Sequence, residues 1–135
     1  MTYLIASDWI IDHLAGRPNA VKLLKELTVG GLAVSIITYA EIYVGIFGGR
    51  SPKTSDQIFR RMLLTMDVLL VSQAIARRAA KIGSTLRRQG TSLPLPDVII
   101  AATALHHDLA LVTRTLSHYE RIPNLKIYRE QSQAT

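Results

Sequence analysis

Three carboxylic acids follow apolar segments of this chain, and they are the residues best placed to do chemistry. Asp8 follows the apolar run that begins at Tyr3, Glu41 lies in a helix after the second such run, and Asp97 opens a nearly all-apolar helix. Carboxylates gathered at one edge of a sheet repel one another unless a cation holds them, and Mg²⁺ or Mn²⁺ accepts such oxygen ligands. A site of this kind can hold a phosphodiester, activate water and stabilise the leaving oxygen. The pattern therefore favours metal-assisted phosphodiester hydrolysis.

Each acid also has a structural explanation. Thr38 and Glu41 have the spacing of a capping box, in which the glutamate satisfies the backbone at a helix start. Asp97 lies where a helix dipole favours a negative charge, and Asp8 has the character of an N-cap. Taken singly, the structural role is favoured for each. Their joint placement favours the catalytic alternative.

Other common kinds of site are poorly supported. The chain has no cysteine, so thiolate metal sites and cysteine nucleophiles are excluded. His106 and His107 are neighbours on a helix and make a poor chelate. His13 is expected at the surface. His118 is expected in a loop near the proposed active edge. No serine–histidine triad and no glycine-rich phosphate loop is recognisable.

Short apolar strands alternate with helices along the whole chain. This pattern predicts an α/β fold with a central parallel sheet of four to five short strands and helices on both faces. Ligands of such sheets gather at the carboxyl ends of the strands. The strands are expected at residues 3–6, 32–35, 68–70, 109–113 and 125–128. The helices are expected from about 9 to 16, from 18 to before 30, and at 38–47, 55–65, 75–86 and 97–107.

The length and charge of the chain limit its class. A chain of 135 residues suits one domain, expected at 1–130, with a frayed tail at 131–135. We expect no signal peptide and no membrane segment, and therefore a cytoplasmic protein. The net charge of +6 favours a polyanionic partner such as nucleic acid, although excess charge can also serve only solubility.

Four segments in register resemble PIN-domain ribonuclease toxins of the VapC type. They are Tyr3-Leu4-Ile5 with Ser7-Asp8-Trp9-Ile10-Ile11-Asp12, then Ser35 to Ile42, then Pro96 to Ala104, and finally Thr113 to Pro123. A single match of this kind is weak, but four in the right order cover nearly the whole chain.

The resemblance implies the toxin of a type II toxin–antitoxin system, a Mg²⁺- or Mn²⁺-dependent endoribonuclease that stops translation. It also implies an RNA substrate such as tRNA or rRNA, a cognate VapB-like antitoxin that lies across the active groove, and a homodimer. A non-catalytic module that binds RNA or antitoxin is the alternative. A small α/β domain that binds metal or nucleotide for another purpose is a third hypothesis.

The resemblance also assigns site residues by position. Glu41 and Asp97 match metal-site acids, Thr113 matches a polar residue that orients the site, and His118 stands where many relatives have aspartate. Ala6 occupies a catalytic and metal-binding position at which the family has aspartate. Asp8, two residues further on, is a candidate metal ligand but does not obviously replace that acid.

The loss of one carboxylate from a shared metal site should weaken metal binding, so we expect little nuclease activity. Two origins of Ala6 stay open, a deliberately disabled variant or a natural degenerate member. Restoring aspartate at position 6 distinguishes a disabled enzyme from a binding module.

Basic side chains on a predicted amphipathic helix are candidates for RNA backbone contact, although such charges usually form a solvated face. Tyr43 and Phe47 could form an antitoxin groove or a dimer contact, or be part of the core. The candidate RNA-binding residues are Arg77, Arg78, Lys81, Arg87, Arg88 and Arg114.

Overall fold

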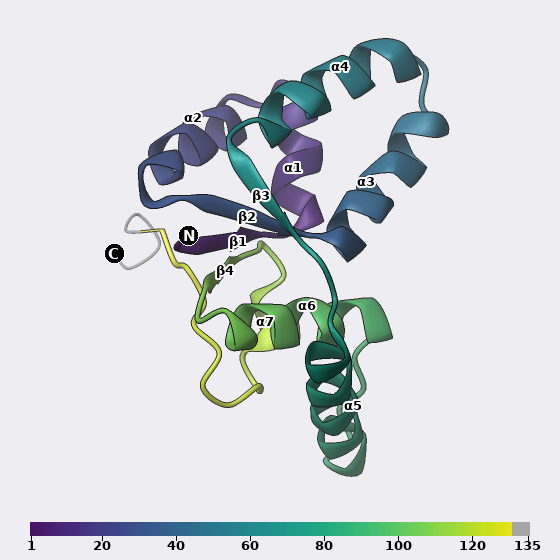
Figure 1. The fold of residues 1–135 in the computed structure, drawn as a ribbon, viewed down its shortest axis with the longest axis vertical. Coiled ribbons are helices and arrows are strands. Elements are labelled where there is room, and N and C mark those ends of the chain that lie inside the picture. The colour runs from purple at the N-terminus through teal and green to yellow at the C-terminus, as the bar shows by residue number, and fades with distance from the viewer. Residues whose placement is uncertain (131–135) are drawn as a thin grey trace.

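The computed structural model describes residues 1–130 and contains a four-stranded, all-parallel sheet with helices on both faces (Figure 1). The strand order is β3-β2-β1-β4. The predicted α/β class and the parallel sheet are confirmed, and the expected frayed tail at 131–135 lies outside the described residues. The strands are β1 (Tyr3–Ile5), β2 (Leu32–Ser35), β3 (Met66–Leu69) and β4 (Ala110–Val112).

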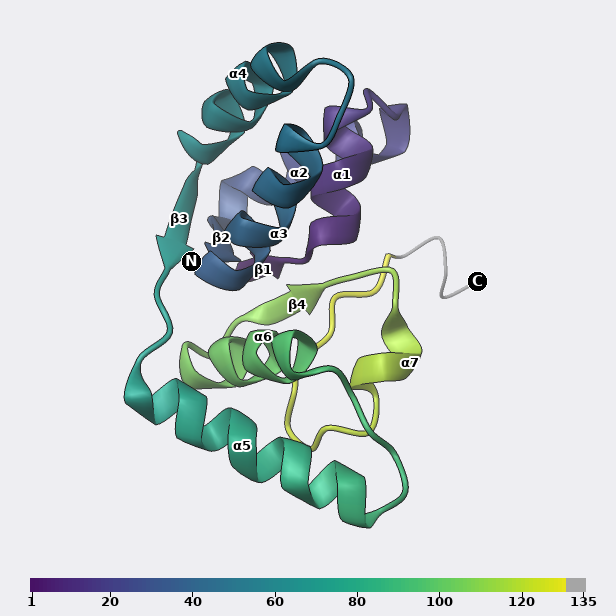
Figure 2. The ribbon, with the colours of Figure 1, turned by 90° about the vertical axis from the view of Figure 1, so that its right-hand side faces the viewer.

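The helices form two layers. Figure 2 shows α1 to α4 on one side of the sheet and α5, α6 and α7 on the other. Within the described residues, no helix combines the length and the apolar character that crossing a bilayer requires. The helices are α1 (Ser7–Leu14), α2 (Pro18–Leu27), a 3₁₀ turn η1 (Thr28–Gly30), α3 (Ile36–Phe47), α4 (Pro52–Leu63), α5 (Gln73–Arg88), α6 (Leu95–His106) and α7 (Leu116–Tyr119).

Alternation along the strands builds a core on each face of the sheet. In β1, Leu4 packs into the core under α6, and Ile5 packs into the core under α1 to α4. The central strands are buried on both faces, as Leu4, Ile5 and Ala33 are all fully buried. Successive strand side chains point to opposite faces, so each strand contributes to both layers. Phe59 of α4, also fully buried, fills the first core together with Tyr39.

Several elements differ from the sequence-based expectation; for example, α4 begins at Pro52 and β3 at Met66, both earlier than expected. Helix α3 begins at Ile36 and not at Thr38, because the Ser35 hydroxyl accepts a hydrogen bond from the Ile37 backbone N–H at 3.0 Å. The predicted capping box is therefore wrong, and the Thr38 hydroxyl is buried without a hydrogen-bond partner among the described residues.

The expected strand at 125–128 is a single parallel bridge between Leu111 and Ile127. The segment around His118, expected as a loop, contains the short helix α7.

Candidate active site

The candidate site lies at the carboxyl edge of the three strands β2, β1 and β4. Ser35 is the last residue of β2, Ala6 follows β1, and Thr113 follows β4. The backbone N–H of Ala6 donates to the Val112 carbonyl at 3.0 Å, which keeps the ends of β1 and β4 together. Loops and helix starts meet at this edge in a parallel sheet, so it is where polar side chains from distant parts of the chain can converge.

Asp8 connects the turn after β1 to the turn after β4. Its Oδ2 accepts from the Arg114 backbone N–H at 2.8 Å and from the Thr113 hydroxyl at 3.2 Å, and its Oδ1 accepts from the Trp9 backbone N–H at 2.8 Å. Asp8 lies inside the first turn of α1, while the N-cap residue is Ala6, which offers no capping side chain. The predicted N-cap role of Asp8 is therefore wrong, and its carboxylate is already engaged by three donors.

Glu41 and Asp97 come together from different helices. The negative charge of Asp97 raises the pKa of Glu41, after the larger effect of partial desolvation. Asp97 lies in the first turn of α6, where the helix dipole favours its charge. Its Oδ2 lies 3.4 Å from Nδ1 of His118, an ion pair only when the histidine is protonated. No side-chain hydrogen bond or ion pair within residues 1–130 engages Glu41, so its carboxylate is available.

Tyr119 lies within electrostatic range of all three acids, and the sequence analysis did not identify it. Its ring is buried, and this burial raises the pKa of its phenol; the charges of Asp97, Asp8 and Glu41 raise that pKa further, in this order. We call Asp8, Glu41 and Asp97 the acid cluster. In the sequence, the one feature that could have indicated a place for Tyr119 in the site is that it directly follows His118.

Position 6 faces the layer that carries Asp97. Ala6 is buried and packs with Leu4 and Ala101 in the core on the α6 side of the sheet. An aspartate here would direct its carboxylate toward the same layer as the first turn of α6. The methyl group of alanine offers no ligand, so this part of the edge is apolar.

The acid cluster as it stands fits a loosely held divalent ion. Mg²⁺ is commonly bound by one or two carboxylates, with waters and substrate phosphate completing its shell, and Glu41 with Asp97 matches that requirement. Asp8 adds little, because its oxygens accept hydrogen bonds from the protein. Within the part of the chain that the structure describes, no three His, Cys, Asp or Glu side chains are arranged to hold a metal.

The predicted RNA-binding side chains line more than one hollow. Arg77, Arg78 and Lys81 line a hollow of about 440 Å³ along α5, while Arg87 lines a different one beside Leu93. The Arg88 guanidinium donates to the Thr85 hydroxyl at 3.4 Å. Arg114 pairs with Asp12 at 3.0 Å and lies 3.7 Å from the centroid of the Trp9 ring, so its charge is largely engaged within the protein.

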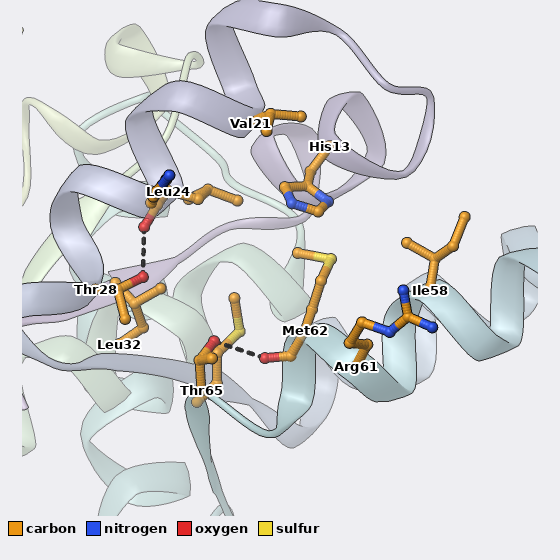
Figure 3. A pocket seen from close by; sticks show the side chains of 11 residues that line it. His13, Val21, Leu24, Thr28, Leu32, Ile58, Arg61, Met62 and Thr65 are labelled. Carbon is orange, nitrogen blue, oxygen red and sulfur yellow. Dashed lines mark hydrogen bonds between the residues drawn. The ribbon is translucent and has the colours of Figure 1, made fainter.

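A pocket of about 480 Å³ lies away from the acids, between α1, α2 and α4 (Figure 3). Its lining is mainly apolar, and the His13 and Met62 side chains point into it. Burial lowers the pKa of His13, which was expected at the surface and is half-buried. No member of the acid cluster lines this pocket, so it is not where the carboxylates would meet a substrate.

The exposed face of α3 carries apolar side chains. Phe47 is 73% exposed and Val44 is 76% exposed, so the core alternative for Phe47 is wrong. Tyr43 is half-buried, and its hydroxyl donates to Asp56 at 2.6 Å. This face is therefore available to a protein partner.

Comparison with known proteins agrees with this architecture. Residues 4–119 match the family model described as PIN domain. The chain is similar to Ribonuclease VapC10 of Mycobacterium tuberculosis, with 33% identity over 91% of this chain and 90% of that protein. It is also similar to Ribonuclease VapC1 of Haemophilus influenzae, with 28% identity over 93% of this chain and 96% of that protein. A solved toxin–antitoxin complex from Klebsiella pneumoniae contains a chain with 30% identity and a TM-score of 0.74, covering 96% of this chain and all of that one.

Proposed function

Because the chain belongs to the PIN domain family and resembles its VapC ribonucleases, we propose that it is a toxin whose metal-dependent endoribonuclease site lacks one carboxylate. The observation that carries the proposal is the meeting of Glu41 and Asp97 at the carboxyl edge of the sheet. Partial desolvation raises the pKa of Glu41 and the charge of Asp97 raises it further, so the two carboxylates are near enough to interact, which supports a shared cation.

Each residue of the site has a proposed role in phosphodiester hydrolysis. Glu41 and Asp97 would hold Mg²⁺ or Mn²⁺, and the bound ion would neutralise phosphate charge and activate water. His118, beside Asp97, can hold a proton at Nδ1 and orient that carboxylate. Asp8 and Thr113 hold the turn after β4 in place, which keeps α7 and His118 against the site.

Position 6 limits the activity of this chain. Asp8 is two residues away and its oxygens are engaged, so it does not substitute for a carboxylate at position 6. With two available acids, metal binding is weak and hydrolysis is slow or absent. An aspartate at position 6 would direct a third carboxylate toward the layer that contains Asp97.

The family and the charge of the chain also suggest partners. The toxin–antitoxin complex that the chain resembles supports a cognate VapB-like antitoxin, and the exposed apolar side chains of α3 support either that contact or a homodimer. The net charge of +6 supports an RNA substrate, with tRNA and rRNA the classes to test first, and the cytoplasm as the place of action.

A second candidate function is a non-catalytic module that binds RNA or antitoxin. The alanine at position 6 is the observation that favours it, because a binding module does not need a complete metal site. The two functions differ in what an Ala6→Asp substitution does.

The decisive experiment incubates total RNA with the native protein and with Ala6→Asp, each with and without Mg²⁺ or Mn²⁺. We expect discrete metal-dependent fragments from Ala6→Asp and few or none from the native protein. Ala6→Asn is the control for shape without charge, and Asp97→Asn in the Ala6→Asp background should abolish cleavage without unfolding. A folded Ala6→Asp protein that leaves tRNA and rRNA intact would support the binding module.

A further inference from the structure

A pocket of about 270 Å³ lies between α5, the end of α6 and the segment after α7, outside the acid cluster. Its floor is apolar and includes Leu86, Leu105 and Ile122. Arg78, Lys81 and Arg121 line the same pocket and are exposed. The pocket therefore places cations beside an apolar hollow.

These three cations have no acidic partner in the part of the chain that the structure describes. None of the ion pairs found within residues 1–130 involves Arg78, Lys81 or Arg121. The Arg121 guanidinium is held at one position, because it donates to the Thr91 hydroxyl at 2.9 Å. Unpaired cations held beside an apolar surface favour an anionic ligand that also has an apolar part.

The neighbouring hollow extends the same charged surface. Arg78 and Lys81 line both this pocket and the hollow of about 440 Å³ that also contains Arg77. The two cations thus lie between the apolar pocket and a hollow lined mainly by basic residues. A nucleic-acid strand has matching chemistry, because it alternates phosphates with planar bases, and bases stack on apolar side chains and on guanidinium groups.

The pocket is connected to the acid cluster through the backbone. Arg121 follows His118 by three residues, and its partner Thr91 precedes Asp97 by six. Figure 2 shows α7 beside the start of α6, with the following segment running toward α5. A strand held at the pocket therefore lies close to the elements that carry the acids.

We propose that this pocket is a subsite for single-stranded RNA, in which Arg78, Lys81 and Arg121 bind phosphate and the apolar floor receives a base. The inference rests on the proposed function, since it takes RNA as the substrate. A polyglutamate peptide, which has no apolar side chains, would pair with the cations but would leave the apolar floor empty. The subsite holds a nucleotide that flanks the cleavage position.

The test measures binding of a fluorescent single-stranded RNA to the native chain in EDTA, over a series of salt concentrations. The triple variant Arg78→Gln, Lys81→Gln, Arg121→Gln should lower the slope of log affinity against log salt by about 2, at about 0.7 per phosphate contact. It should also weaken binding at low salt at least about tenfold. Lys81→Gln alone should lower the slope by about 0.7, and it disturbs no side-chain hydrogen bond or ion pair found within residues 1–130.

The matched control neutralises three exposed lysines on α2 and α4, Lys22, Lys25 and Lys53, with glutamine. Both triple variants have a net charge of +6 − 3 = +3, so a general charge effect would be equal in the two. We expect the control to keep most of the native slope. Equal losses in the two variants would overturn the proposal.

Two further ligands test the apolar floor. RNA should bind about tenfold more tightly than an abasic ribose-phosphate chain of the same length. Equal affinity for the two, or equal competition by a polyglutamate peptide, would mean a general polyanion surface and would also overturn the proposal. Because no divalent ion is present, the result is independent of cleavage. The proposed nuclease can therefore fail while the subsite holds, and the subsite can fail while Ala6→Asp still cuts RNA.

Discussion

Replacing Asp8 with alanine should destabilise the fold, because this carboxylate connects the turns after β1 and β4. The substitution removes an acceptor for the backbone N–H groups of Trp9 and Arg114 and for the Thr113 hydroxyl. A hydrogen bond to a charged group contributes about 1.5–3 kcal/mol. Asp8 is half-buried and the Trp9 contact is local, so the lower end applies to the two cross-chain bonds. The expected loss is about 3 kcal/mol in the free energy of unfolding.

Thermal and urea unfolding measure this loss. For a chain of 135 residues, 1 kcal/mol corresponds to roughly 3–4 °C, so Asp8→Ala should lower the melting midpoint by roughly 10 °C. Asp8→Asn keeps one acceptor oxygen and should lose about half as much.

Asp12→Ala is the matched control, because it removes the same group from the same helix. Among residues 1–130, the Asp12 carboxylate pairs with the exposed Arg17 and Arg114 side chains alone, at 3.2 and 3.0 Å, and surface pairs contribute about 0–1 kcal/mol. If Asp8→Ala were no more destabilising than Asp12→Ala, the connecting role of Asp8 would be refuted.

The other expectations concern the acid cluster, the exposed face of α3 and the core. The pKa of Glu41 is raised in the folded protein, so the folded protein binds the carboxyl proton more tightly than the unfolded chain does. The protonated Glu41 therefore favours folding below the unfolded pKa, and this contribution is lost as pH rises through the folded pKa. Glu41→Gln should therefore raise the melting midpoint at pH 7 and not at pH 3.5; an unchanged midpoint at pH 7 would contradict this. Phe47→Ser should shift a homodimer toward monomer in light scattering without lowering the melting midpoint, because the side chain is 73% exposed; an unaltered dimer would place the interface elsewhere. Phe59→Ala should lower the free energy of unfolding by about 3–5 kcal/mol in urea, because this ring is fully buried; a loss below 1 kcal/mol would contradict the packing.

The apolar runs of the sequence predicted most of the fold. Strands at Tyr3 and Leu32 and the helix at Asp97 are where the pattern puts them, because buried parallel strands and central helices need continuous apolar residues. The start of α3 was misplaced because Ser35 and Thr38 are both good capping residues, and only the strand end at Ser35 decides between them. The four-residue helix α7 is too short for periodicity to reveal.

The candidate site was only partly accessible from sequence. Parallel-sheet topology predicts that Glu41 and Asp97 approach one edge, and the charge of Asp97 does raise the pKa of Glu41, after the larger effect of desolvation. The engagement of Asp8 was not predictable, since its partners Thr113 and Arg114 lie more than 100 residues away. Side-chain contacts across such separations depend on how two turns pack, and local pattern does not encode that.

Mn²⁺ binding tests the central claim, that the site is one carboxylate short, most directly. Electron paramagnetic resonance titration at pH 7 should give an affinity at least about tenfold higher for Ala6→Asp than for the native chain, because an added charged ligand contributes strongly to a site with two acids. Ala6→Asn should bind like the native chain, and adding Asp97→Asn to Ala6→Asp should remove the gain. Equal Mn²⁺ affinity in the native and Ala6→Asp proteins, both folded, would contradict the account.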